Sequence, residues 1–130
     1  MSTYSRGRKP ALKAAPEALV KAPPAPKHLS RQAKAEWKRV MPQLIARQTL
    51  TKADLGNLEA YCAAVGASRQ IAEKMAEGEL PDLKLGGLQI RYSTLARQLA
   101  AEFGLTPVSR QRLGTSSPAE DDDDDNPLAV

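Results

Sequence analysis

Lysine and arginine side chains are the residues of this 130-residue chain whose spacing suggests a chemistry. A cation that neutralises a phosphate group releases condensed counterions, so clustered cations favour binding to a nucleic acid backbone. We predict such contacts for three clusters, although a solubilising tail and an ordinary solvated helix face are the simpler alternatives. The clusters are an N-terminal group (Arg6, Arg8, Lys9 and Lys13), a helical stripe (Arg31, Lys34 and Lys38) and a C-terminal pair (Arg110 and Arg112).

The charges are arranged in blocks along the chain. Residues 1–28 contain six lysines or arginines and one acidic residue, and residues 29–113 contain thirteen basic and eight acidic residues. Residues 114–130 contain six acidic residues and no base. A basic arm, a mixed body and an acidic tail suit a protein that holds a polyanion and is regulated by another protein. Two roles for the tail stay open, which are docking on a basic partner and competition with the polyanion for the arm.

Residue types for catalysis or metal binding do not occur at the spacing that such sites need. His28 is the single histidine, and the sequence contains neither an HExxH motif nor a GxxxxGK[ST] phosphate-binding loop. The aspartates at 121–125 lack a preformed cage for a divalent cation, so we interpret them as a solvated tail. We therefore expect no catalytic residue, no metal and no cofactor, in a protein that is not an enzyme.

The composition restricts the cellular context. The single cysteine, Cys62, excludes an internal disulfide and a cysteine-based metal cluster. No run of about 18 apolar residues occurs, so no membrane span is expected. The basic N-terminus is not followed by an apolar segment, and we therefore expect no secretory signal.

The periodicity of the apolar residues predicts an all-α fold with a helical-hairpin-like core of three main helices and a short C-terminal helix. Pro-rich residues 1–28 are expected to form a disordered basic arm, residues 29–113 the helical core, and residues 114–130 a disordered acidic tail. Ser30 is a suitable N-cap for the first helix, in which Pro42 is expected to cause a kink or break.

Local signals delimit the remaining elements. Thr51 and Asp54 form a capping-box-like pair, and the second helix is expected to stop at Gly78. Residues 78–91 are interpreted as a linker, whose alternating residues 83–90 around a Gly-Gly pair are compatible with a small hairpin. The third helix ends at Gly104 in a Schellman-type cap, and Thr106-Pro107 then begin the short final helix.

The second helix is apolar around most of its circumference, which indicates that it is covered on more than one side. A body of about 85 residues buries only a modest fraction of its surface. We therefore predict that one stripe of the helix contacts a second copy of the chain, and burial within the monomer is the alternative. The stripe consists of Gly56, Ala60, Ala63, Ala64, Ala67 and Ile71.

The region from Leu99 to Leu113 has the layout of a helix-turn-helix, with Gly104 at the turn. However, Arg110 occupies a position of the second helix that is apolar in that motif. A small helix-turn-helix-like transcription regulator, acting as a monomer or dimer, is therefore kept as the alternative function.

Four segments together resemble the small subunit family of bacteriophage terminases, in the short form found in tailed phages and prophages. Their order and spacing, rather than any single segment, carry the resemblance. They are Gly7-Arg8-Lys9-Pro10 with Leu12-Lys13; Pro26 with Leu29, Ala33, Glu36 and Trp37; Leu50-Thr51 with Asp54, Leu58, Tyr61 and Cys62; and Glu102-Phe103-Gly104-Leu105-Thr106-Pro107 with Ser109, Arg110, Arg112 and Leu113. The five-aspartate tail is not regarded as a family feature.

The resemblance implies a non-catalytic protein that binds double-stranded viral DNA and recruits and modulates the large terminase subunit, which holds the ATPase and nuclease. It also implies a ring of roughly eight to eleven copies, built from heterologous contacts that close on rotation. The expected location is the cytoplasm of the bacterial host.

Overall fold

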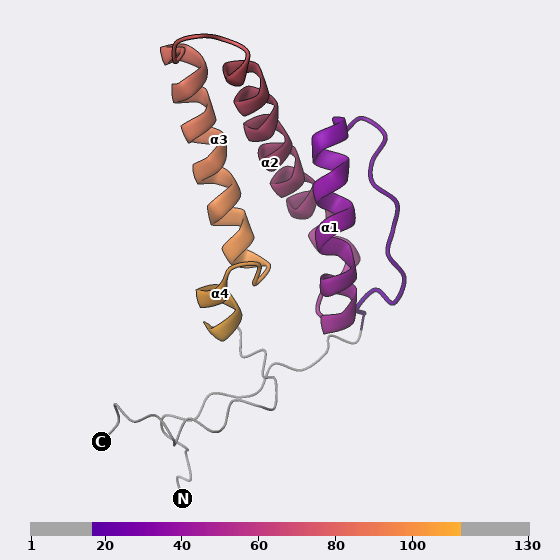
Figure 1. The fold of residues 1–130 in the computed structure, drawn as a ribbon. Coiled ribbons are helices and arrows are strands. Elements are labelled where there is room, and N and C mark those ends of the chain that lie inside the picture. Colours follow the sequence, from indigo (N-terminus) through magenta and orange to yellow (C-terminus); the bar gives the residue numbers. More distant parts are fainter. Residues whose placement is uncertain (1–16, 113–130) are drawn as a thin grey trace, which may run out of the picture.

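The computed structural model describes residues 17–112, and every regular element in that range is helical (Figure 1). The predicted all-α class is confirmed. Helix α2 lies between α1 and α3, and each main helix runs antiparallel to the one before it. The elements are α1 (Arg31–Arg47), a short 3₁₀ helix (Lys52–Asp54), α2 (Leu55–Ala76), α3 (Leu83–Glu102) and α4 (Pro107–Arg112).

Helix α1 begins at the predicted cap, where the backbone N–H of Ala33 donates a hydrogen bond of 3.1 Å to Ser30 Oγ. Of the kink or break predicted at Pro42, the break does not occur, because α1 continues through this residue to Arg47. Proline provides no N–H for the carbonyl oxygen four residues earlier, which belongs to Lys38. Both residues are exposed, so solvent can satisfy that carbonyl group.

Residues 17–28 differ from the predicted disordered arm, because they lie along the outer side of α1 (Figure 1). The indole N–H of Trp37 donates a hydrogen bond of 3.0 Å to the carbonyl oxygen of Pro23. Near the other end of the segment, the N–H of Leu19 donates to the carbonyl oxygen of Leu50 at 2.8 Å. The rest of the predicted arm (1–16) and the acidic tail, which falls within 113–130, lie outside the described residues.

The capping box before α2 is confirmed. The Asp54 carboxylate accepts hydrogen bonds from the Thr51 N–H at 2.8 Å and from the Thr51 hydroxyl at 3.1 Å. Thr51 precedes the 3₁₀ helix and Asp54 is its last residue, and α2 follows directly from it. Helix α2 ends at Ala76, two residues before the predicted stop at Gly78.

The hairpin considered for residues 83–90 is wrong, because these residues form the first turns of α3. Asp82 caps this helix by accepting a hydrogen bond of 2.9 Å from the N–H of Leu85. Glycine in a helix costs about 1 kcal/mol relative to alanine, so the Gly86-Gly87 pair does not prevent the helix from forming. A methyl carbon of Met75 on α2 would lie 3.9 Å from a Cβ at Gly86, which is an ordinary van der Waals distance, so the side chain of Met75 packs beside this glycine.

The predicted Schellman cap ends α3. Gly104 has a φ of 65°, and the N–H of Leu105 donates a hydrogen bond of 2.9 Å to the carbonyl oxygen of Ala100. A guanidinium nitrogen of Arg47 donates to the carbonyl oxygens of Phe103 and Gly104, each at 2.9 Å. The last residue of α1 therefore ties that helix to the end of α3.

Helices α1 and α2 approach most closely where Gly66 faces Ala33. A Cβ added at Gly66 would lie 2.7 Å from the backbone nitrogen of Ala33 and 2.8 Å from its Cβ. Around this point the two helices form the main part of the core. Its fully buried apolar side chains include Val40, Leu44, Leu58 and Cys62.

Cys62 is expected to be chemically inert in the folded protein. Burial, reinforced by the negative charge of Glu36, raises the pKa of its thiol to about 12. Because the thiolate is the nucleophile, the native protein should react with iodoacetamide at pH 8 far more slowly than the protein in denaturant. The rate is measured by mass spectrometry, and equal rates in the two conditions would contradict this burial.

Candidate nucleic-acid interface

The predicted stripe Arg31, Lys34 and Lys38 lies on α1, with the first and last side chains exposed and the middle one half-buried. At about 100° per residue, the three positions fall within one narrow sector of the helix. None of them forms an ion pair with the residues that the structure describes. Within α1 they have little choice of partner, because Glu36 is the only acidic residue of this helix.

The C-terminal pair lies on α4, a helix of six residues. Arg112 is exposed, whereas Arg110 is half-buried and close enough to Arg47 to affect it. Burial first, and the charge of Arg110 second, lower the pKa of the Arg47 side chain. Two cations thus lie together at the end of α3, where the carbonyl oxygens give a partial negative charge.

Of the three predicted clusters, the structure describes two, the stripe on α1 and the pair on α4. The N-terminal group Arg6, Arg8, Lys9 and Lys13 lies outside residues 17–112, so its role stays a prediction. Val108 of α4 is 59% exposed. Ser109 is the buried residue of that short helix, and its N–H donates a hydrogen bond of 3.1 Å to Thr106 Oγ1.

A buried carboxylate between α1 and α2 was missed by sequence reasoning. Glu36 is 0% exposed and accepts hydrogen bonds from Arg39 at 2.5 and 2.9 Å and from the Tyr61 hydroxyl at 2.5 Å. A guanidinium N–H of Arg69 donates at 3.1 Å to Oε1 of the same carboxylate, the oxygen that also accepts from Arg39 Nε. The available signal was the position of this glutamate on the apolar side of α1, three residues before an arginine.

The cations decide the ionisation of this cluster. Burial alone would raise the pKa of the Glu36 carboxyl, but hydrogen bonds from Arg39 and Tyr61 and the charges of Arg39 and Arg69 outweigh it. The net effect is a lowered pKa, so Glu36 is ionised at neutral pH. Burial and the neighbouring carboxylate together raise the pKa of the Tyr61 hydroxyl, which therefore stays a proton donor.

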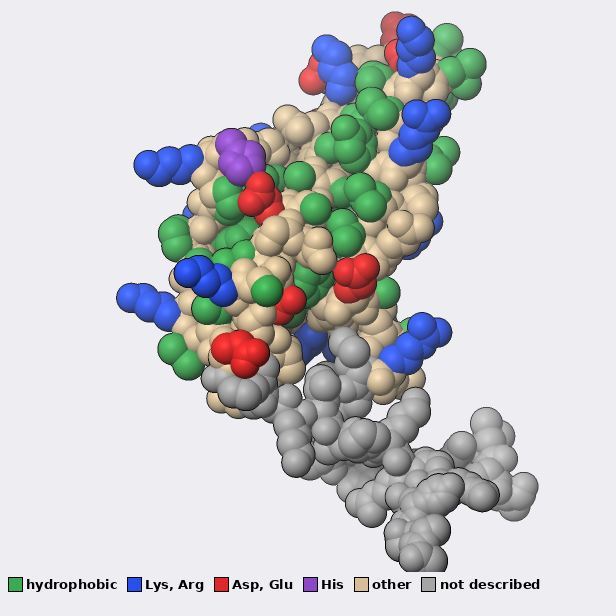
Figure 2. Space-filling view, turned by 180° about the vertical axis from the view of Figure 1, so that it is seen from behind, with side chains coloured by type: hydrophobic (Ala, Val, Ile, Leu, Met, Phe, Trp, Pro, Cys, Tyr) green, Lys and Arg blue, Asp and Glu red, His purple; other side chains and the backbone are tan. Residues whose placement is uncertain are grey.

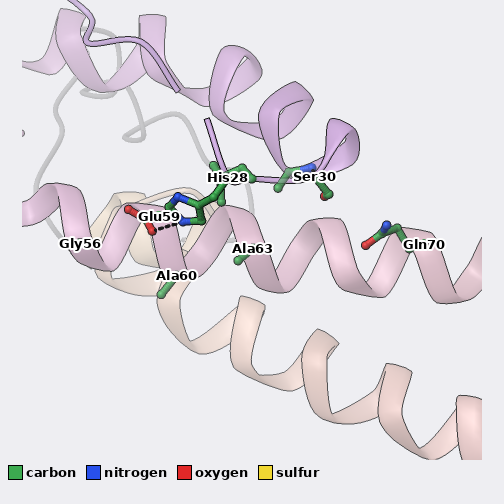
Figure 3. A pocket seen from close by; sticks show the side chains of 9 residues that line it. His28, Ser30, Gly56, Glu59, Ala60, Ala63 and Gln70 are labelled. Carbon is green, nitrogen blue, oxygen red and sulfur yellow. Dashed lines mark hydrogen bonds and ion pairs between the residues drawn. The ribbon is translucent and has the colours of Figure 1, made fainter. Parts of the chain in front are cut away.

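The small-residue stripe of α2 divides between surface and core. Gly56, Ala60 and Ala63 are exposed, Ala67 is half-buried, and the remaining two residues, Ala64 and Ile71, are buried in the chain itself. The exposed three form part of the floor of a shallow groove between α2 and the start of α1 (Figure 3). At its edge, His28 Nε2 and Glu59 Oε2 are 2.7 Å apart and connect the segment before α1 to α2.

Helix α3 carries large apolar side chains that no part of the described chain covers. Leu83 is 92% exposed and Ile90 is 68% exposed, while Leu88 and Leu95 are exposed to a smaller degree. Figure 2 shows hydrophobic side chains, mixed with lysine and arginine, gathered over α2 and α3 towards the α2–α3 turn. This end of the helical hairpin extends beyond α1 (Figure 1).

Comparison with known proteins gives one match. A protein-family model described as "Phage terminase, small subunit" matches residues 33–120, which is more than half of the chain. The chain belongs to the phage terminase small subunit family. No curated protein and no solved structure matches it at a significant level. The resemblance identified in the sequence is therefore confirmed at the level of the family.

Membership of the terminase small subunit family places the chain in viral DNA packaging. The small subunit of this family is generally the non-catalytic one, and DNA and the large terminase subunit are its partners. Within residues 17–112, no group of three or more histidine, cysteine, aspartate or glutamate side chains could hold a metal ion. No helix in that part of the chain is long and apolar enough to cross a membrane.

Proposed function

We propose that this chain is a DNA-binding adaptor of a phage terminase, which recognises viral DNA and recruits and modulates the large ATPase and nuclease subunit in the host cytoplasm. The family match over residues 33–120 is the observation that carries this proposal. The exposed cationic stripe of α1, which has no ion pair among the described residues, supports the DNA-binding part.

The adaptor also assembles with copies of itself, in a ring of roughly eight to eleven subunits that closes by rotation. Two features support self-association. The exposed part of the α2 stripe, Gly56, Ala60 and Ala63, forms a groove with a small-residue floor, and α3 leaves large apolar side chains uncovered. If the uncovered apolar side chains of α3 pack into the α2 groove of a neighbouring copy, the contact joins two different surfaces. Such a head-to-tail contact is the type that forms rings.

Assembly would multiply the cations that face the duplex. Each subunit contributes the stripe Arg31, Lys34 and Lys38 and the pair Arg110 and Arg112, and the arm residues Arg6, Arg8, Lys9 and Lys13 add further charge. Contacts to phosphate groups do not depend on the base sequence of the DNA. We therefore expect DNA binding that is weakly selective and whose affinity depends steeply on salt concentration.

Replacing Arg31, Lys34 and Lys38 together with glutamine tests the DNA-binding part. The slope of log affinity against log salt concentration should become shallower by about 0.9 for each lost phosphate contact. A control variant with Lys52, Lys74 and Lys84 replaced by glutamine removes the same charge elsewhere and should keep the slope. Affinities are measured by fluorescence anisotropy on a labelled duplex. A wild-type protein without salt-dependent binding would refute the proposed function.

A further inference from the structure

A second cationic surface lies on a different side of α2 from the small-residue groove. Arg69 is six residues after Ala63, which places the two about 120° apart round the helix. Here α2 and α3 border a depression of about 200 Å³, to which α2 contributes Arg69 and α3 contributes Arg97. Its other lining residues are Val65, Ser68, Ser93 and Ala96, so the lining contains no carboxylate.

The buried carboxylate of Glu36 joins a third arginine to this surface. One of its oxygens accepts from Arg69, and both accept from Arg39 of α1. The two arginine side chains are 57% and 48% exposed, whereas the glutamate side chain is 0% exposed. The carboxylate is therefore buried beneath the two arginine side chains. Each guanidinium ion still has N–H groups that do not bond to Glu36, and these are available to a ligand.

The charge of this surface is not balanced. Arg97 has no hydrogen bond or ion pair with the residues that the structure describes. This surface thus carries three guanidinium groups from three helices, and the buried carboxylate of Glu36 pairs with two of them, Arg39 and Arg69. Arginine presents a planar fork of donors that matches the oxygens of a phosphate group, and anchoring at one end reduces the entropy lost on binding. The hydroxyl groups of Ser68 and Ser93, whose oxygens lie 3.0 Å apart, hydrogen-bond to each other and leave one O–H as a further donor in the depression.

We propose that Arg39, Arg69 and Arg97 form a row that binds phosphate groups of duplex DNA, with Glu36 as the residue that positions the first two. This inference rests on the proposed DNA-binding function and assigns it a contact surface distinct from the α1 stripe. None of the three arginines lines the small-residue groove, so a second copy seated in the groove contacts other residues.

The test compares two arginine-to-glutamine variants of α3 in the full-length chain. Arg97→Gln removes a member of the row, whereas Arg91→Gln removes the same charge from an exposed position about 120° away round the same helix. Neither arginine has a partner among the described residues, so both variants should fold. We expect Arg97→Gln to make the salt slope shallower by about 0.9 and Arg91→Gln to leave it unchanged.

The outcomes separate this inference from the function on which it rests. Equal slopes for the two variants, in a protein that still binds DNA, would overturn the arginine row alone and would point to a protein partner for this surface. No salt-dependent binding by the wild type would overturn both proposals.

A third variant tests the positioning role. Glu36→Gln raises the net charge by one, so simple electrostatic attraction predicts a steeper slope. Positioning predicts a shallower one, because Arg39 and Arg69 lose their anchor. A steeper slope, in a variant that keeps the wild-type helical signal in circular dichroism, would exclude the positioning role.

Discussion

Replacing Gly66 with alanine is expected to lower the free energy of unfolding by about 2 kcal/mol. The new Cβ would lie 2.7 to 2.9 Å from three atoms of Ala33, two of them in the backbone of α1. Backbone atoms cannot turn aside as a long side chain can, so α1 and α2 must separate and part of the core must loosen. Thermal unfolding at a fixed protein concentration should show a fall in Tm of roughly 10 °C.

Gly87→Ala is the matched control for this prediction. A Cβ at Gly87 has no neighbouring atom within 4 Å, and the residue is exposed in α3. Because alanine favours a helix by about 0.5–1 kcal/mol over glycine, this variant should unfold at a slightly higher temperature. The same chemical change is therefore expected to have opposite signs at the two positions. An unchanged or raised Tm for Gly66→Ala would contradict the close approach of α1 and α2.

Replacing Arg39 and Arg69 together with glutamine is expected to cost about 3–5 kcal/mol of stability at pH 7. Of the three side chains that donate hydrogen bonds to Glu36, only Tyr61 would remain unchanged. The glutamate side chain would stay fully buried. A buried carboxylate without a cation loses the attraction that offsets its desolvation. Urea unfolding monitored by circular dichroism measures the loss.

The dependence of stability on pH should reverse in the same variant. In the wild type the pKa of Glu36 lies below its ordinary value of 4.5, so its stabilising contribution is present above that value. The contribution is lost as the pH falls through the lowered pKa of the folded state. Without the two arginines, burial raises this pKa, and protonation relieves the buried charge. The variant should therefore become more stable as the pH falls from 7 towards 5.

Adding Glu36→Gln to the double variant provides the control. This triple variant has no charge at the three positions, and replacing a whole buried ion set by neutral groups is often nearly neutral for stability. It should recover most of the loss and show no gain in stability between pH 7 and pH 5. A triple variant as unstable as the double one would show that arginine packing, rather than the buried charge, causes the loss.

The sequence predicted those features of the fold that depend on neighbouring residues. The capping box of Thr51 and Asp54, the Schellman cap at Gly104 and the start of α4 at Pro107 all occur as expected. Each depends on backbone groups within a few positions of the residue that satisfies them, so residue type and spacing identify them.

Features that depend on distant residues were not predictable in the same way. The residues around Gly86 resembled a hairpin, but the Asp82 cap and the approach of Met75 accompany a helix instead. Glu36 resembled an ordinary helix glutamate, because its partner Arg69 lies 33 residues further along the chain. The segment before α1 has no periodicity, and its order comes from contacts such as the one between Trp37 and Pro23.

Light scattering of the purified full-length chain tests most directly whether the uncovered side of α2 contacts another copy. The wild type should have a mass several times the 14.0 kDa of one chain, and Ala63→Glu should reduce it to a single chain. Ala72→Glu places the same charge about 180° away on α2, at an exposed position, and should leave the mass unchanged. A dilute wild-type sample that is fully folded as a 14.0 kDa particle would contradict the assembly and the multivalent DNA platform that depends on it.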